Sequence, residues 1–175
     1  NLQKFTVKAQ EAVQQALEIA QSKNHQGIEP AHLLKAFLQD EGGLVLTLLD
    51  RLGANADTLS ALADRAIEKL PTVTGASVSG QYIGTDLNKA FDAALKEAEA
   101  LNDEYVATEH LLMALADGSD GIASALTGQG VTKDALLGVL RDVRGGQRVA
   151  DPYAESKYDA LNRYARDLNE AARKG

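Results

Sequence analysis

The side chains of this chain that could do chemistry are its three histidines and a small group of carboxylates. His32 and His110 stand at equivalent places in two similar stretches, so they should lie on two related helices. A metal site would need more ligands at short spacing, and the residues one helical turn further on are Ala36 and Ala114. We therefore expect both histidines to be packed, locally bonded side chains, and we expect no metal site.

The densest acidic group near a predicted loop consists of Asp103, Glu104 and Glu109. The helix dipole favours carboxylates at the start of a helix, which accounts for Glu109 without any catalytic role. Hydrolysis would need a pocket and a tuned pKa, and no sequence pattern indicates either. A binding role stays open, in which these carboxylates lie along a groove and meet basic groups of a bound chain.

Sequence motifs for nucleotide binding and covalent catalysis are absent. The chain contains neither the phosphate-binding loop G-x-x-x-x-G-K-[ST] nor the serine turn G-x-S-x-G. It has no cysteine, which excludes a disulfide scaffold and thiol catalysis and fits a reducing compartment such as the cytoplasm. We expect this stretch not to be an enzyme, with no catalytic residue and no cofactor of its own.

Composition points to a helical domain without nucleic-acid or membrane partners. The 175 residues are 45% hydrophobic but only 5% aromatic, and Ala and Leu supply most of the apolar content. This composition favours closely packed helices. The net charge is −7, whereas a nucleic-acid-binding surface would be basic. No apolar run approaches the ~20 residues of a membrane span.

The chain contains two copies of one unit. Residues 28–34 read I-E-P-A-H-L-L, and residues 106–112 read V-A-T-E-H-L-L, at an offset of 78. After a gap of one residue the offset becomes 77, which pairs Gly53 with Gly130. Two units of about 65 residues therefore make up most of the chain.

Apolar residues recur at helical spacing through both copies, so we predict an all-α fold of eight helices, four in each copy. Strand-like alternation is absent. Polar residues that can cap a helix N-terminus precede most of these segments: Thr6, Asn55, Thr85, Thr108 and Thr132. Neither copy has many large apolar residues of its own, so each should bury one face against the other.

Glycine-rich stretches mark the expected boundaries. The predicted divisions are a two-repeat domain over 1–144 (repeat one 5–70, inter-repeat linker 71–84, repeat two 85–144), a flexible linker over 145–154, and a helix over 155–175. An amphipathic stripe begins in this last helix at Tyr158, and its apolar face has no evident place in the two-repeat body. We therefore expect it to belong to a part of the protein beyond this chain.

Several of these stretches resemble a known family. The opening F-T-x-K-A-Q-E-A at 5–12 and the two His-Leu-Leu helices resemble the N-terminal domain of Clp-type ATP-driven unfoldases. Within that group, K-L-P-x-V-x-G at 69–75 resembles the inter-repeat linker of the ClpB disaggregases. Arg144-Gly145-Gly146, followed by the pattern from Tyr158 to Gly175, resembles the ClpB segment that leads into the first ATPase module. The resemblance covers essentially the whole chain, which looks like a fragment of such a protein.

The resemblance implies an all-α, pseudo-twofold domain (a double Clp-N motif) mounted by a flexible linker on a hexameric ATPase ring. Its implied role is to capture exposed apolar segments of unfolded or aggregated proteins and to deliver them to that ring. The parent protein would bind ATP and Mg²⁺, form a homohexamer through its ATPase modules and cooperate with Hsp70-type chaperones. No nucleic acid or membrane partner is implied.

The resemblance also implies a binding groove. Thr6, Asp103 and Glu109 occupy positions that resemble the family's polar substrate-contact residues at the rim of that groove. Phe91 occupies an apolar position that lines it. Three further groove positions are less apolar than the leucines often found there: Ala93, Glu97 and His110.

Two alternatives stay open. In the related ClpC-type domains, which dock adaptor proteins and phosphoarginine tags, each repeat carries a Thr-Glu-His pattern. Here repeat two has it at 108–110, but repeat one reads Pro-Ala-His at 30–32, so a paired tag-reading site is not expected. A purely structural cap that stabilises oligomers would instead show tight self-association and no affinity for unfolded chains. An independent hydrolase has no defensible set of residues.

Overall fold

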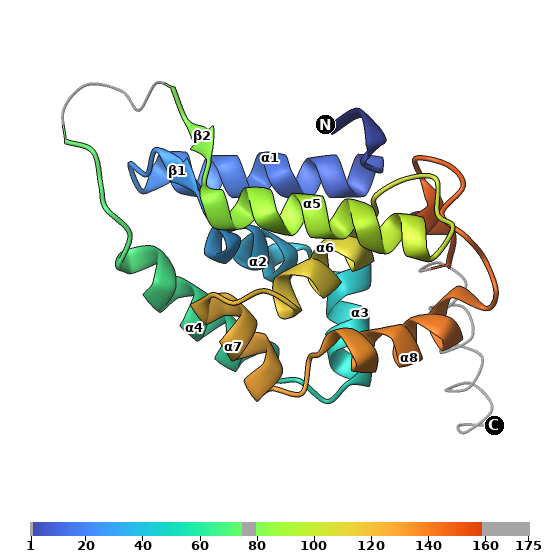
Figure 1. Cartoon of the computed structure of the whole chain (residues 1–175). Coiled ribbons are helices and arrows are strands. Elements are labelled where there is room, and N and C mark those ends of the chain that lie inside the picture. The colour runs from blue at the N-terminus through green and yellow to red at the C-terminus, as the bar shows by residue number, and fades with distance from the viewer. Residues whose placement is uncertain (1, 75–79, 159–175) are drawn as a thin grey trace.

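The structure is a computed structural model that describes residues 2–74 and 80–158 (Figure 1). Within these residues the chain forms eight α-helices, a short 3-10 helix, two very short strands and a further helical stretch over 154–158. In chain order they are η1 (Leu2–Lys4), α1 (Val7–Ser22), β1 (Gly27–Ile28), α2 (Pro30–Gln39), α3 (Leu44–Arg51), α4 (Ala56–Glu68), β2 (Tyr82–Ile83), α5 (Thr85–Ala100), α6 (Thr108–Ala116), α7 (Gly121–Gly128) and α8 (Lys133–Arg144). The all-α prediction is confirmed. The predicted stripe beyond Tyr158 lies outside the described residues.

Capping chemistry explains where the helices begin. Three predicted caps are confirmed, each accepting a hydrogen bond from the backbone N–H three residues further on: Thr6, Asn55 and Thr132. The predictions for Thr85 and Thr108 are wrong by one position, because the caps are Gly84 and Ala107. At α6 the N–H of Ala107 donates to Nδ1 of His110 at 2.8 Å, so this helix start is bonded without a hydroxyl cap.

Short backbone pairings join the two repeats, although the sequence shows no strand-like alternation. β1 pairs with β2 in parallel, and Phe5 forms an equivalent isolated bridge with Val106. In each pairing, residues that follow the first helix of one repeat contact residues that precede the first helix of the other. These pairings therefore join the repeats at two symmetric places, and they hold α1 and α5 side by side (Figure 1).

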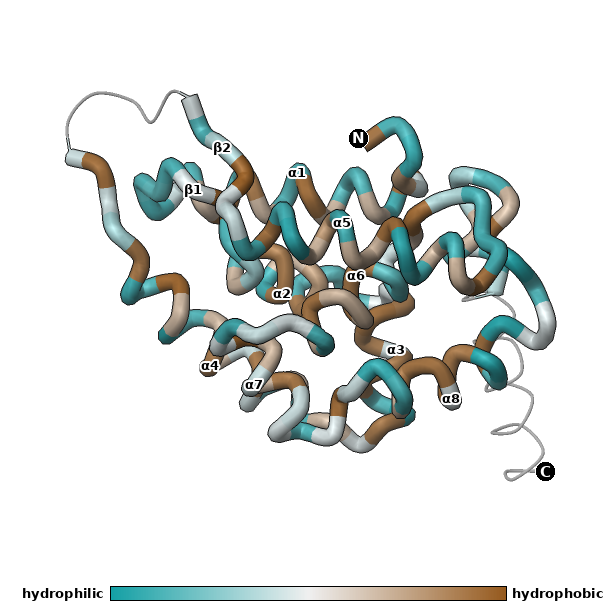
Figure 2. Tube along the Cα trace, viewed as in Figure 1, coloured by the Kyte–Doolittle hydropathy of each residue, from teal (hydrophilic) through white to brown (hydrophobic). Residues whose placement is uncertain are grey.

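The two His-Leu-Leu helices, α2 and α6, occupy the centre of the molecule (Figure 1). Every residue of α6 is buried, and this helix contacts α1, α3, α5, α7 and α8. In α1 and α5, hydrophilic residues alternate with apolar ones, as expected for helices with one face in solvent (Figure 2). Because α6 is buried on all sides, its polar residues Glu109 and His110 must find partners inside the protein.

The chain after α8 turns back onto the two-repeat body. Gly145, with φ 57°, ends α8 in the left-handed region. The N–H of Glu104 donates to the carbonyl of Val149 at 2.8 Å, and Val149 and Tyr158 are fully buried. We predicted a flexible linker over 145–154 and no place for the face of Tyr158, whereas these contacts hold Val149 and Tyr158 in the core, while residues 145–148 stay exposed. We call residues 147–158 the strap.

Candidate binding site

Three of the four predicted site residues come together at the N-terminal ends of α1 and α6. Thr6 caps α1, Glu109 lies in the first turn of α6, and Asp103 follows α5. Their exposed fractions are 0%, 1% and 9%, so they do not form the exposed rim that we expected. The strap covers them, because Thr6 Oγ1 donates to Glu155 Oε2 at 2.6 Å and the Val149 N–H donates to Asp103 Oδ1 at 2.9 Å. Their contact with substrate stays a prediction.

Phe91, the fourth predicted residue, lies apart from this cluster on α5. It is half-buried, and its ring meets that of Phe5 edge-on with the centroids 5.4 Å apart. Glu97, on the same helix, forms an ion pair with Lys133 at 2.6 Å. Phe91 thus packs on the core, and its role in lining a groove also stays a prediction.

Arg144, the last residue of α8, neutralises the buried carboxylates. Its Nη2 lies 2.9 Å from Asp103 Oδ2 and 3.0 Å from Glu109 Oε2. Burial alone would lower the pKa of Arg144, but the charges of Glu109 and Asp103 raise it, so the guanidinium stays protonated. The Tyr158 hydroxyl donates to Glu109 Oε2 as well, and burial followed by the charge of Glu109 raises the pKa of Tyr158. The result is a buried ionic network to which the strap contributes a side chain.

The two equivalent histidines bond locally, as predicted, but their outer partners differ. In His32 and His110, Nδ1 accepts a hydrogen bond from the backbone N–H three residues earlier. Nε2 therefore carries the ring hydrogen and faces inward. It meets His25 Nδ1 at 3.0 Å in repeat one and Asp103 Oδ2 at 2.7 Å in repeat two. Burial, followed by the proximity of His25, lowers the pKa of His32 to about 4, so the pair is neutral at pH 7.

Glu155 is a third buried carboxylate, and the strap supplies it. Its Oε2 accepts hydrogen bonds from the Thr6 hydroxyl and from the Thr108 N–H, the latter at 3.1 Å. Burial and the negative charge of Glu109 raise the pKa of Glu155 to about 7. Within 2–74 and 80–158, three buried oxygens nearby have no hydrogen-bond partner: Thr108 Oγ1, Glu109 Oε1 and Glu155 Oε1. The N-terminal end of α6 therefore has unused hydrogen-bonding capacity.

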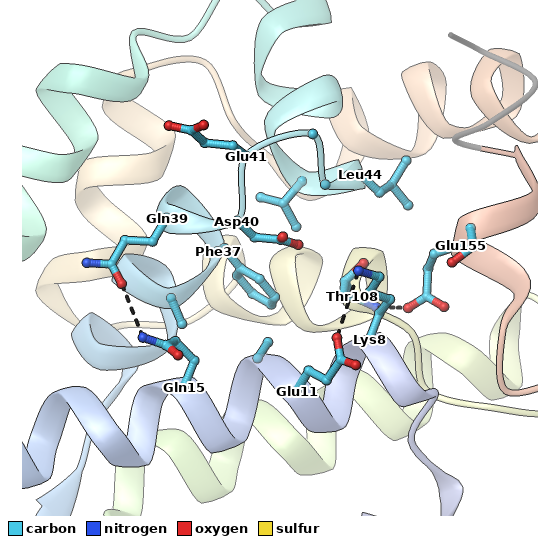
Figure 3. Close-up of a pocket in the computed structure, with 16 residues that line it drawn as sticks. Lys8, Glu11, Gln15, Phe37, Gln39, Asp40, Glu41, Leu44, Thr108 and Glu155 are labelled. Carbon is cyan, nitrogen blue, oxygen red and sulfur yellow. Dashed lines mark hydrogen bonds and ion pairs between the residues drawn. The ribbon is translucent and has the colours of Figure 1, made fainter. Parts of the chain in front are cut away.

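A cavity of about 640 Å³ opens beside this cluster, between α1, the α2–α3 turn and the strap (Figure 3). Its apolar lining residues are Ala12, Ala36, Phe37, Leu44 and Val45. Its charged lining residues are Lys8, Glu11, Asp40, Glu41 and Glu155. None of the four predicted site residues lines it, so the sequence interpretation missed this cavity. Thr108 and Glu155 connect it to the buried network, because they belong to both.

A second hollow, of about 580 Å³, lies beside η1 and the C-terminal end of α5. Asp103 and Leu95 line it, and Leu95 is one of the few exposed large apolar side chains. The described residues contain no cluster of three or more His, Cys, Asp or Glu side chains placed to hold a metal ion. They also contain no helix long and apolar enough to cross a membrane.

The predicted site residues did not include three members of the buried cluster, Arg144, Glu155 and Tyr158. A comparison of the two copies would have identified Arg144, because the offset of 77 aligns it with Ile67, which is a buried apolar residue in repeat one. A charge at a position that should be buried indicates a partner of opposite charge. Glu155 and Tyr158 give no such signal, since the strap has no described counterpart in repeat one.

The fold and the site define an all-α domain of two four-helix repeats with a buried charged network between the second repeat and the strap. A family model described as the Clp repeat (R) N-terminal domain matches residues 4–129. The chain belongs to this family.

Curated relatives and solved structures agree with this assignment. Chaperone protein ClpB of Rhodopseudomonas palustris is 38% identical over 176 residues, covering 100% of this chain and 20% of the relative. The chain therefore spans about a fifth of the length of the curated relatives it matches. The Hsp104 N-terminal domain from Candida albicans has a TM-score of 0.74 at 23% identity, covering 87% of this chain and 99% of that one. A ClpV N-domain in complex with a VipB peptide has a TM-score of 0.60 at 15% identity, covering 78% and 89%. These structural similarities concern the fold alone.

Proposed function

We propose that this domain captures exposed apolar stretches of unfolded or aggregated polypeptides for a ring-shaped ATPase. Membership of the Clp N-terminal family and the similarity to ClpB chaperones support this proposal. A fold relative solved with a peptide is consistent with it. In the longer protein the domain would be carried by a cytoplasmic homohexamer that uses ATP and Mg²⁺ and cooperates with Hsp70-type chaperones.

The observation that carries the proposal is the cavity beside α1. It has an apolar wall, including Phe37 and Leu44, and an acidic border on the side of Asp40 (Figure 3). A site of this kind can bury a few apolar side chains of an extended chain without selecting a sequence. Each buried methylene contributes only about 0.8 kcal/mol, so binding should be weak and reversible, as first contact with a substrate requires.

The predicted residues enter the proposal indirectly. Thr6 and Asp103 hold the strap through Glu155 and Val149, and the strap forms one side of the cavity. Their replacement would therefore disturb the cavity by releasing the strap, with no need for direct contact with the captured chain. This distinguishes them from Leu44, which lines the cavity itself.

The test is a titration of isotope-labelled domain with an unfolded, apolar-rich protein, followed by NMR chemical shifts. We expect shifts concentrated on Ala12, Phe37 and Leu44, and no comparable shifts with the same protein in its folded form. Ala12→Gln should weaken binding, because it places a polar side chain in the cavity. Ala66→Gln, at a half-buried position on α4 that does not line the cavity, is the matched control. Equal responses to the folded and unfolded forms, or no response to either, would overturn the proposal.

A further inference from the structure

The cavity beside α1 has a polar end that capture of apolar segments does not explain. Thr108 and Glu155 line this end, although they are only 6% and 2% exposed. Thr108 Oγ1 and Glu155 Oε1 have no hydrogen-bond partner among the residues that the structure describes. Buried oxygens are costly unless a donor meets them. This end of the cavity is therefore suited to a group that donates hydrogen bonds.

The carboxylates around this end of the cavity favour a positively charged hydrogen-bond donor. Glu11 and Asp40 also line the cavity, and the Asp40 carboxylate points toward Thr108 and Glu155 (Figure 3). Lys8 is the only cation among the described lining residues, and its Nζ pairs with Glu11 at 3.8 Å. Both side chains of that pair are more than two-fifths exposed, and exposed ion pairs contribute little. The acidic end of the cavity thus keeps a negative charge that a bound cation can offset.

The apolar wall suits the rest of such a side chain. Phe37, Leu44 and Val45 line the cavity together with Ala12. Lysine and arginine bury their aliphatic stems along apolar surface while the charged end reaches polar groups. A cavity of about 640 Å³ with apolar walls and an acidic end can accommodate both parts of the side chain.

We infer that this cavity is a subsite for a lysine or arginine side chain of a bound polypeptide. The stem lies on the apolar wall, and the cationic end meets the oxygens of Asp40, Thr108 and Glu155. The inference rests on the proposed capture function and names the side-chain class that this site prefers. A captured segment would therefore combine apolar residues with a basic one.

Repeat two provides an internal contrast. The repeat offset aligns Glu11 with Lys89 and Asp40 with Gly118, so the acidic lining is not reproduced there. Thr108 itself aligns with Pro30, which has no hydroxyl. The subsite therefore depends on features that distinguish the two copies, and a pair of equivalent cation sites is not expected.

The experiment compares two labelled, unstructured, apolar-rich peptides that differ only at one residue, lysine in one and Nε-acetyl-lysine in the other. Binding to the whole domain is followed by fluorescence anisotropy. We expect the lysine peptide to bind about tenfold more tightly, as one charge-assisted hydrogen-bonding group would give. At pH 8, where Glu155 with its pKa of about 7 is ionised, Asp40→Asn and Glu155→Gln should abolish this difference, since both keep an acceptor but lose the charge. Glu18→Gln is the matched control, because Glu18 is an exposed carboxylate of α1 that does not line the cavity.

A variant that binds the lysine peptide more tightly separates the subsite from misfolding, because a damaged fold would lose affinity. Lys8→Gln removes the cation that lines the cavity. It should increase the affinity for the lysine peptide by about threefold and leave the affinity for the acetylated peptide unchanged. Equal binding of the two peptides to the unmodified domain would overturn the subsite and leave the capture function standing. Absence of binding by either peptide would overturn both. A tenfold preference that survives Asp40→Asn and Glu155→Gln would place the cation elsewhere and also overturn the subsite.

Discussion

The two repeats share a backbone plan but differ at the start of their central helices. In repeat one, His32 faces His25 in a neutral pair, and the pKa of His32 is lowered to about 4. In repeat two, His110 faces Asp103, which also meets Arg144. The repeat offsets align these residues in four pairs: His25 with Asp103, Ala31 with Glu109, His32 with His110, and Ile67 with Arg144. Repeat two therefore carries three buried charges at positions where repeat one carries none.

This difference shows what each half does in the fold. The neutral pair of repeat one is complete within its own repeat. The ionic network of repeat two also uses the strap, through the Val149 N–H on Asp103 and the Tyr158 hydroxyl on Glu109. Buried ion pairs add little net stability, but they fix geometry, because a lone buried charge is costly. Repeat two thus supplies the charged contacts of the strap, whereas repeat one holds it through the uncharged Thr6 hydroxyl on Glu155.

The largest effect should follow from removing Arg144. Arg144→Met leaves Asp103 and Glu109 buried without their cation, which should lower the free energy of unfolding by about 3–5 kcal/mol. Urea denaturation followed by circular dichroism measures this loss. Ile67→Met, at the aligned position in repeat one, is the control, and a swap of similar volume should cost less than about 1.5 kcal/mol. Similar losses in the two variants would contradict the asymmetry between the repeats.

Acid should act first on repeat one. The pKa of His32 is about 4 in the folded protein and 6.5 in the unfolded chain. Between these two pH values the unfolded chain therefore binds more protons than the folded protein. Stability should therefore fall as pH decreases from 6.5 to 4, by on the order of 2 kcal/mol from this group. The change His25→Asp recreates the partner of repeat two and should reduce that loss, because a carboxylate favours protonated His32. His25→Asn supplies no charge, and it would contradict this reasoning if it reduced the loss equally.

The strap should respond to pH in the opposite direction. The pKa of Glu155 is raised from 4.5 to about 7 in the folded protein, so folding favours its protonated form. Its contribution is fully present below pH 4.5 and is lost as pH rises through about 7. Hydrogen-exchange protection of the Glu104 N–H, which donates to the Val149 carbonyl, reports on the docked strap. Protection should be greater at pH 5.5 than at pH 8, by on the order of 1 kcal/mol. Glu155→Gln should remove this dependence, and an unchanged dependence in that variant would assign it to another group.

Local sequence signals predicted the fold better than the site. The duplicated His-Leu-Leu stretches and the caps at Thr6, Asn55 and Thr132 act within a few residues, so helices and repeats could be predicted. Thr6, Asp103 and Glu109 lie at the same end of the fold under the strap, and their contact with substrate stays a prediction. Their burial could not be predicted, because it depends on contacts across 149 residues between Thr6 and Glu155.

The alignment of the two copies contained more information than periodicity alone. Arg144 aligns with a buried Ile67, which already indicates a buried charge in repeat two. The predictions of helix caps at Thr85 and Thr108 were wrong because tertiary contacts also decide where these helices begin. Gly84 leaves room for the Glu29 carboxylate, which would collide with any side chain at that position. Helix starts of this kind are decided by partners distant in sequence.

The smallest effect should come from a single hydroxyl of the strap. Tyr158→Phe keeps the buried ring but removes the hydrogen bond to Glu109, so it should cost about 1 kcal/mol, mostly as local opening of the strap. Exchange protection at the Glu104 N–H should decrease, while protection within α2 stays unchanged. Tyr153→Phe is the matched control, because Tyr153 belongs to the same strap but is 61% exposed. If the loss in Tyr158→Phe were spread evenly over both repeats, the strap would open only with the whole domain, and its contact with the charged network of repeat two would not open separately.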